Sequence, residues 1–237
     1  MDGWMQVNFY NYFMKIGDLM KISDKSMNNL VYDVLKLIDF SYNQMKKDNN
    51  EFYVTEKGRD TKNNMPLENS ITNRLVKYMR KNKAKFNLEL LGFEVESASD
   101  FAENYATVGF IDIKVTNIST LFTKFNDENV YFAFECKRIN LENRKINNYI
   151  EHGINRFKYG KYSKNLTTAG MIAYCENSNI SVIIEHVNNK MNNERLYKNE
   201  ILNLKNSYYY ISTHNRKDSD AITIHHLFLN FSKMIKI

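Results

Sequence analysis

The sequence predicts a mixed α/β fold in which a central sheet is flanked by helices. Apolar segments of strand length alternate along the chain with segments of helical periodicity, which is the pattern of a sheet covered by helices. Two of the strand-like segments, residues 107–116 and 130–137, carry charged residues among apolar ones. Desolvated charge is costly unless it is paired or binds a metal, so these strands also mark a candidate functional site.

The N-terminal part of the chain reads as helical over residues 5–47. Ser23 or Asp24 can cap a helix that ends near Lys47, because short polar side chains satisfy the free N–H groups of a helix start. A polar connector with a short apolar segment follows over residues 48–64. We expect residues 1–64 to form a helical N-terminal extension, a possible dimerisation or partner element, and residues 65–237 to form the main domain.

The main domain is expected to begin with a helix opened by Pro66, where the missing N–H of proline does no harm. Ile71, Leu75 and Met79 recur at helical spacing along it. The elements that we expect after it are strands at about 88–96, 107–116 and 130–137, a helix at 141–159, a strand at 170–175, a helix at 178–191, and strands at 208–213 and 221–229.

Composition limits the classes of protein to consider. The chain has 237 residues, 43% of them hydrophobic, and a formal net charge of +6, which suits a polyanionic partner without requiring one. No apolar run is long enough to cross a membrane, and no secretory signal is evident, so we expect a cytoplasmic protein. Cys136 and Cys175 are then expected to be buried thiols. His214, His225 and His226 match no metal or catalytic pattern and are expected to be structural.

The charged strand residues define a constellation with its own chemistry. Residues two apart on a strand share a face, so Glu135 and Lys137 project together, and Asp112 lies on the preceding strand. Hydrolysis of a phosphodiester needs a hard divalent cation and an activated water, and Mg²⁺ prefers oxygen ligands. Asp112, Glu135 and the carbonyl of Cys136 could supply these oxygens, and Lys137 could orient the water. Glu68, in the Pro66 helix, could hold a second metal or an outer water.

The pattern Glu68, Asp112 and Glu135-x-Lys137, with its order of elements, resembles the PD-(D/E)xK nuclease superfamily, which has the restriction-endonuclease-like fold. The resemblance covers about residues 66–176, and Ile111 stands where the name-giving proline would be. It implies a Mg²⁺-dependent nuclease, with Mn²⁺ as a substitute, in which Asp112 and Glu135 bind the metal, Lys137 assists the water, and the product carries a 5′-phosphate.

The segment after Glu-x-Lys is similar to a pattern in bacterial restriction-like and phage-defence nucleases. On a regular helix, Lys145, Tyr149, His152 and Arg156 would form one stripe, which could contact phosphates. Tyr149, Arg156 and also Tyr162 are therefore candidate phosphate contacts. The stripe is equally typical of a solvated helix face.

These observations favour a metal-dependent endonuclease that acts on double-stranded DNA in bacterial restriction or phage defence, as a homodimer or with a defence-system partner protein. Two alternatives stay open: a non-catalytic nucleic-acid-binding or assembly subunit of the same fold, and an RNA-directed nuclease activated by a partner. Glu-x-Lys alone is also compatible with a cross-strand ion pair on an exposed face. Glu68 could likewise be an acidic residue that is favoured near the start of a helix and has no catalytic role.

Overall fold

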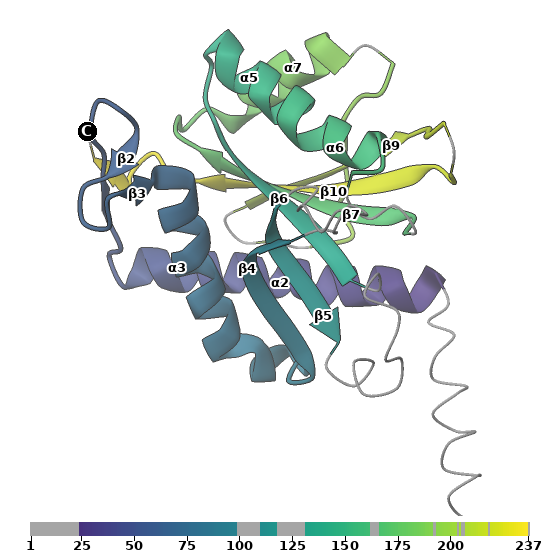
Figure 1. Ribbon diagram of the computed structural model, residues 1–237, viewed down its shortest axis with the longest axis horizontal. Coiled ribbons are helices and arrows are strands. Elements are labelled where there is room, and N and C mark those ends of the chain that lie inside the picture. Colours follow the sequence, from purple (N-terminus) through teal and green to yellow (C-terminus); the bar gives the residue numbers. More distant parts are fainter. Residues whose placement is uncertain are drawn as a thin grey trace, which may run out of the picture.

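A computed structural model of the protein describes residues 24–98, 110–117, 131–161, 166–191, 193–202, 204, 207–217 and 219–236. Its main feature is a seven-stranded mixed sheet in the order β4-β5-β6-β7-β10-β9-β8 (Figure 1). The strands are β4 (Leu91–Ala98), β5 (Phe110–Asn117), β6 (Tyr131–Ile139), β7 (Thr168–Cys175), β8 (Tyr197–Lys198), β9 (Ser207–His214) and β10 (Ile222–Asn230). The predicted mixed α/β class with a central sheet is confirmed.

The strand order places β6 in the interior of the sheet, between an antiparallel and a parallel neighbour. β4, β5 and β6 are successive antiparallel neighbours, whereas β6 pairs with β7, and β7 with β10, in parallel. Parallel neighbours need a crossover connection, usually a helix, and helices follow both β6 and β7. Residues 132–137 of β6 are all buried, so the charged residues on this strand are desolvated as the sequence predicts.

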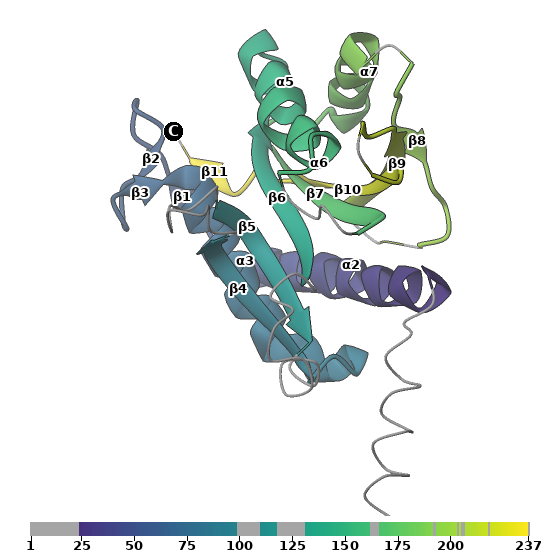
Figure 2. The same ribbon diagram turned by 45° about the vertical axis from the view of Figure 1, so that its right-hand side comes forward.

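Helices cover both faces of the sheet (Figures 1 and 2). α2 (Asp24–Lys47) and α3 (Leu67–Asn82), which is followed by a 3₁₀ turn (Lys83–Phe86), share one core with one face. α5 (Asn143–Tyr149), a π-helical turn (Ile150–Ile154), α6 (Asn155–Lys158) and α7 (Ile180–Met191) share a second core with the opposite face. The predicted helix from residue 24 to residue 47 is confirmed.

Two short strand pairs lie outside the main sheet. β1 (Phe52–Tyr53) pairs in parallel with β11 (Ile235–Lys236). β2 (Arg59–Asp60) pairs antiparallel with β3 (Met65–Pro66), so α3 begins directly after Pro66. The proline therefore precedes the helix instead of occupying its first turn.

Residues 24–64 are packed into the main domain. Val34, Ile38 and Met45 of α2 are fully or almost fully buried in the core that also holds α3 and the sheet, and β1 is tied to β11. The apolar face of α2 needs a partner, and the sheet supplies it. The predicted division at residue 64 therefore does not separate two cores, and residues 1–23 of the predicted extension lie outside the described residues.

The histidines of the last strands form a buried hydrogen-bond chain. The Ser212 hydroxyl lies 2.7 Å from Nε2 of both His214 and His226, and His226 Nδ1 lies 2.8 Å from the Tyr149 hydroxyl. Burial lowers the pKa of His226 well below its ordinary value, so this imidazole is neutral at pH 7. This chain ties β9 and β10 to α5, in agreement with the structural role predicted for His214 and His226. His225 Nδ1 lies instead 2.6 Å from the hydroxyl of Tyr209.

Both cysteine side chains are buried and unpaired, as predicted. No helix among the described residues is long and apolar enough to cross a membrane.

Candidate active site

Three carboxylates converge on the ammonium group of Lys137. Its Nζ lies 2.7 Å from Glu135 Oε1, 3.2 Å from Glu68 Oε1 and 3.5 Å from Asp112 Oδ2. The carbonyl oxygen of Cys136 also accepts a hydrogen bond from this Nζ at 2.8 Å. The structure thus brings together all four of the residues that the sequence nominated as catalytic, from α3, β5 and β6.

The carboxylate of Asp112 lies where β5 and β6 separate. The ladder between the two strands ends at the pair Ile113–Phe134, so Asp112 and Glu135 would be the next partners in register. Instead, the backbone N–H of Cys136 donates to Asp112 Oδ2 at 2.7 Å. A side-chain oxygen thus takes the place of a backbone carbonyl, and the side chain of Asp112 keeps 24% of its surface exposed.

Glu68 reaches the same point from the first turn of α3. Its Oε2 accepts the backbone N–H of Arg138 at 2.8 Å, while Oε1 faces Lys137. The position near a helix start suits a negative charge, but both oxygens are directed at β6. Glu68 therefore joins α3 to the carboxyl end of β6, a contact that a favourable position near a helix start does not by itself explain.

Burial and neighbouring charges together set the protonation of Glu135 and Lys137. Burial, followed by the nearby charge of Asp112, raises the pKa of Glu135 to about 7 although Lys137 and Arg156 oppose the change. Burial also opposes the ammonium charge of Lys137, but the carboxylates of Asp112, Glu68 and Glu135 outweigh it and raise its pKa above the usual lysine value. Lys137 is therefore a permanent cation, and Glu135 changes charge near neutral pH.

The oxygen atoms of this cluster suit a hard divalent cation. Glu135 Oε2 is buried and has no hydrogen-bond partner among the described residues, which is an unfavourable state that a cation would relieve. Mg²⁺ typically takes one or two carboxylates and completes its shell with waters and phosphate oxygens. Within the described ranges no group of three or more His, Cys, Asp and Glu residues is arranged to hold a metal ion. A cation at this point would therefore have only two carboxylates, those of Asp112 and Glu135, and the carbonyl of Cys136 as protein donors, with waters or phosphate oxygens as the rest of its shell.

Arg156 contacts Glu135 from the helix that follows β6. One guanidinium nitrogen donates to Glu135 Oε1, the oxygen that also faces Lys137. The π-helical turn before it brings Gly153 against β7: a Cβ at Gly153 would lie 2.5 Å from the Met171 side chain. π-helical turns of this kind occur frequently at functional sites. Arg156, predicted as a phosphate contact, is therefore placed at the carboxylate cluster itself.

The structure corrects the prediction for Tyr149. This side chain is fully buried, and its hydroxyl bonds to His226, so it faces the core and not the site. The reason is that Tyr149 belongs to the apolar side of the helical segment, together with Ile146, Ile154 and Phe157. The predicted stripe was chosen from the spacing of polar side chains and did not take this apolar side into account. Tyr162 lies outside the described residues.

Glu96 on β4 is a nearby acidic residue that the sequence did not single out. It would pair with Asp112, but the β4–β5 ladder omits this pair and resumes at Ser97 and Ile111. Glu96 has a φ of +50°, a left-handed conformation that is unfavourable for a residue with a Cβ. Its carboxylate accepts a hydrogen bond from Asn69, the neighbour of Glu68 on α3. No sequence pattern marks a single Glu on a strand, so this distortion next to Asp112 could not be foreseen.

Comparisons with protein-family models, with curated proteins and with solved structures found no match to this chain. The case for its chemistry therefore depends on the geometry of the site.

Proposed function

We propose that this protein is a metal-dependent endonuclease that hydrolyses phosphodiester bonds in DNA. The observation that carries the proposal is the convergence of Asp112, Glu135 and Glu68 on Lys137, at the point where β5 and β6 separate. Buried charges of both signs cost free energy to assemble, and apolar side chains at the same positions would often give an equally stable sheet. Such concentrations of perturbed ionisable groups are typical of active sites.

Each residue has a defined task in this reaction. Asp112, Glu135 and the carbonyl of Cys136 would hold Mg²⁺ or Mn²⁺, which when bound stabilises negative charge on the phosphate and lowers the pKa of water. Lys137 remains protonated and donates hydrogen bonds, so it orients the attacking water or the phosphate and does not act as a base. Glu68 restrains the Lys137 ammonium and fixes α3 against β6.

The arrangement of the elements also supports a restriction-endonuclease-like fold. That resemblance expects a helix with Glu, an antiparallel strand pair with Asp, a strand with Glu-x-Lys, and a helical crossover to a parallel strand. α3, β4–β5, β6, and α5–α6 followed by β7 occur in this order. A role in restriction or phage defence, alone or with a partner protein, is the biological setting in which we place this activity.

We expect metal binding to depend on pH through Glu135. Protonated Glu135 cannot ligate a cation, and its pKa in the metal-free protein is raised to about 7. The apparent Mn²⁺ affinity should therefore be nearly constant above pH 8 and fall by about tenfold for each pH unit below 7. Isothermal titration of the full chain at pH 6, 7 and 8 measures this directly.

Two variants control that titration. Asp112→Asn should abolish Mn²⁺ binding at every pH, whereas Glu185→Gln, which removes an exposed carboxylate on α7, should leave the affinity unchanged. An affinity that does not change between pH 6 and pH 8 would exclude Glu135 as a ligand.

The function itself is tested by incubating the protein with supercoiled plasmid DNA and with an RNA of matched sequence, each with Mg²⁺ or with a chelator. We expect metal-dependent nicking or linearisation of the DNA, with 5′-phosphate ends. Binding of nucleic acid without any Mn²⁺ binding or cleavage would instead identify a non-catalytic subunit, and cleavage of the RNA alone would identify an RNA-directed nuclease.

A further inference from the structure

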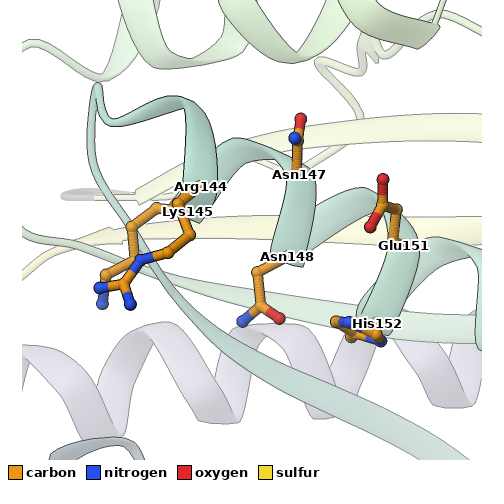
Figure 3. Close-up of a pocket in the computed structure, with 6 residues that line it drawn as sticks. All are labelled: Arg144, Lys145, Asn147, Asn148, Glu151 and His152. Carbon is orange, nitrogen blue, oxygen red and sulfur yellow. The ribbon is translucent and has the colours of Figure 1, made fainter.

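A polar pocket opens along α5 and the π-helical turn, beside the candidate active site. It has a volume of about 640 Å³, which lies within the range of ligand-binding pockets. Its lining consists of Arg144, Lys145, Asn147, Asn148, Glu151 and His152 (Figure 3). Figure 3 shows Arg144, Lys145 and Asn148 on one side of the helix, whereas Asn147 and Glu151 point to the other side.

The pocket is joined to the catalytic cluster by a short series of contacts. Lys145 Nζ lies 3.7 Å from Glu176 Oε1, an oxygen that also accepts a hydrogen bond from the side chain of Arg138. The backbone N–H of Arg138 in turn donates to Glu68, which faces Lys137. These contacts place Lys145 among the charged groups that surround the cluster, close enough for the charge of Glu68 to act on it. This is a position from which a cation could contact a phosphate next to the scissile bond.

The chemistry of the lining favours a phosphate over a base. Arg144 and Lys145 give a positive excess over Glu151, and the asparagine amides can donate hydrogen bonds. None of the six lining residues is a Phe, Tyr or Trp, and His152 is the single aromatic ring among them, so cationic and amide donors outnumber stacking surfaces in this pocket. Arg144 is exposed and has no salt bridge among the described residues, which leaves its five N–H donors available for phosphate oxygens.

We propose that this pocket binds a backbone phosphate of the substrate strand next to the cleaved bond, with Arg144 and Lys145 as its main ligands. The inference rests on the proposed function, because it assigns a position on the same substrate. It also replaces the predicted contact by Tyr149: the residues that face the strand are Arg144, Lys145 and Asn148, while Tyr149 supports their helix from the core.

The test measures the salt dependence of nucleic-acid binding in the full chain carrying Asp112→Asn, with a chelator present so that no cleavage occurs. A labelled DNA duplex and an RNA of the same sequence are the two probes. Affinity falls as salt rises, and the plot of log affinity against log salt has a negative slope. Loss of one phosphate contact makes this slope less steep, by about 0.9 on duplex DNA and about 0.7 on a single strand. A lower slope below means this smaller magnitude. We expect Arg144→Gln and Lys145→Gln each to lower the slope by such an amount on at least one probe.

Lys198→Gln is the matched control, because it removes one cationic charge from β8, an edge strand of the sheet that does not line this pocket. It should leave the slope unchanged. An unchanged slope for both Arg144→Gln and Lys145→Gln on both probes overturns the inference, as does a parent protein that binds neither probe. Arg144 is exposed, so its substitution should not disturb the fold even if that of Lys145 does.

Failure of the pocket and failure of the nuclease are distinguishable. If the wild-type chain cleaves DNA but both pocket variants leave the salt dependence of the Asp112→Asn chain unchanged, the nuclease stands and the pocket assignment is wrong. If the pocket variants lower the slope but the wild-type chain never cleaves with Mg²⁺ or Mn²⁺, the phosphate site stands and the proposed activity is wrong.

Discussion

Asp112→Asn and Glu135→Gln are each expected to abolish metal-dependent DNA cleavage while the protein stays folded. Both substitutions keep the shape of the side chain but remove the charge that would hold the cation. A bound metal contributes several kcal/mol of charge stabilisation in the transition state, and each 1.4 kcal/mol is about tenfold in rate. The cleavage rate should therefore fall by roughly 10³-fold or more, as measured by plasmid linearisation at pH 8 with Mg²⁺.

Glu185→Gln on the exposed side of α7 is the control for removal of one carboxylate, and it should cut like the wild-type protein. Circular dichroism of each variant shows whether the fold is retained. If either site variant cleaves at the wild-type rate, Asp112 and Glu135 do not form the active site.

The second prediction is a large loss of stability when Lys137 is replaced by alanine. Its ammonium is the cation on which Glu135, Asp112 and Glu68 converge, and breaking a buried ion pair by removing one partner typically costs about 3–5 kcal/mol. The free energy of unfolding of Lys137→Ala at pH 8, measured with urea, should therefore be lower by about this amount. Lys198→Ala, at an exposed ion pair with Glu200, should change it by less than about 1 kcal/mol.

The pH dependence identifies the cause of that loss. Glu135 has a raised pKa in the folded state, so its folded form binds a proton more readily than the unfolded chain does, and the stability that it contributes increases as the pH falls through 7. Without Lys137 this effect should be larger, because the buried carboxylate then has fewer cations to oppose protonation. Lys137→Ala should accordingly be less destabilised at pH 6 than at pH 8.

Added Mn²⁺ gives a further check, because a ligand that binds only the folded state stabilises it. The midpoint of unfolding of Lys137→Ala at pH 8 should rise with Mn²⁺ by more than that of the wild-type protein, since the cation replaces the lost positive charge. Lys137→Ala with wild-type stability at both pH values would contradict the assignment of Lys137 as the centre of the cluster.

The sequence was sufficient for the elements that follow a simple period. The helix at 24–47 and the strands around Asp112 and Glu135 are marked by regular apolar spacing, and their observed bounds lie close to the predicted ones. Glu-x-Lys on one strand and Asp on its neighbour imply proximity because adjacent antiparallel strands align their residues. Glu68 was nominated in another way, from its place in the helix after Pro66 and from the resemblance to the nuclease pattern, and its contacts with Lys137 and Arg138 depend on how α3 packs.

The features that sequence reasoning missed have no periodic signal. The π-helical turn at 150–154 adds a local change of pitch that a single helical count spanning Lys145 to Arg156 cannot include. Tyr149 carries a hydroxyl, so it was counted with the polar stripe although its ring belongs to the core. The separation of β5 from β6 at Asp112 depends on tertiary packing, and so does the left-handed conformation of Glu96.

The pairing of β1 with β11 makes the position of Glu68 dependent on a distant part of the chain. Contacts between residues so far apart in sequence close a long loop, and such contacts form late in folding because their entropic cost comes first. The hairpin that leads into α3 and Glu68 is anchored by this pairing, so its opening would be a sub-global event that releases Glu68 while the central sheet persists. The amides of Phe52 and Val54, which donate to Met234 and Lys236, should then exchange with solvent hydrogen faster than those of β6, and the complete carboxylate cluster around Lys137 would form only after this pairing closes.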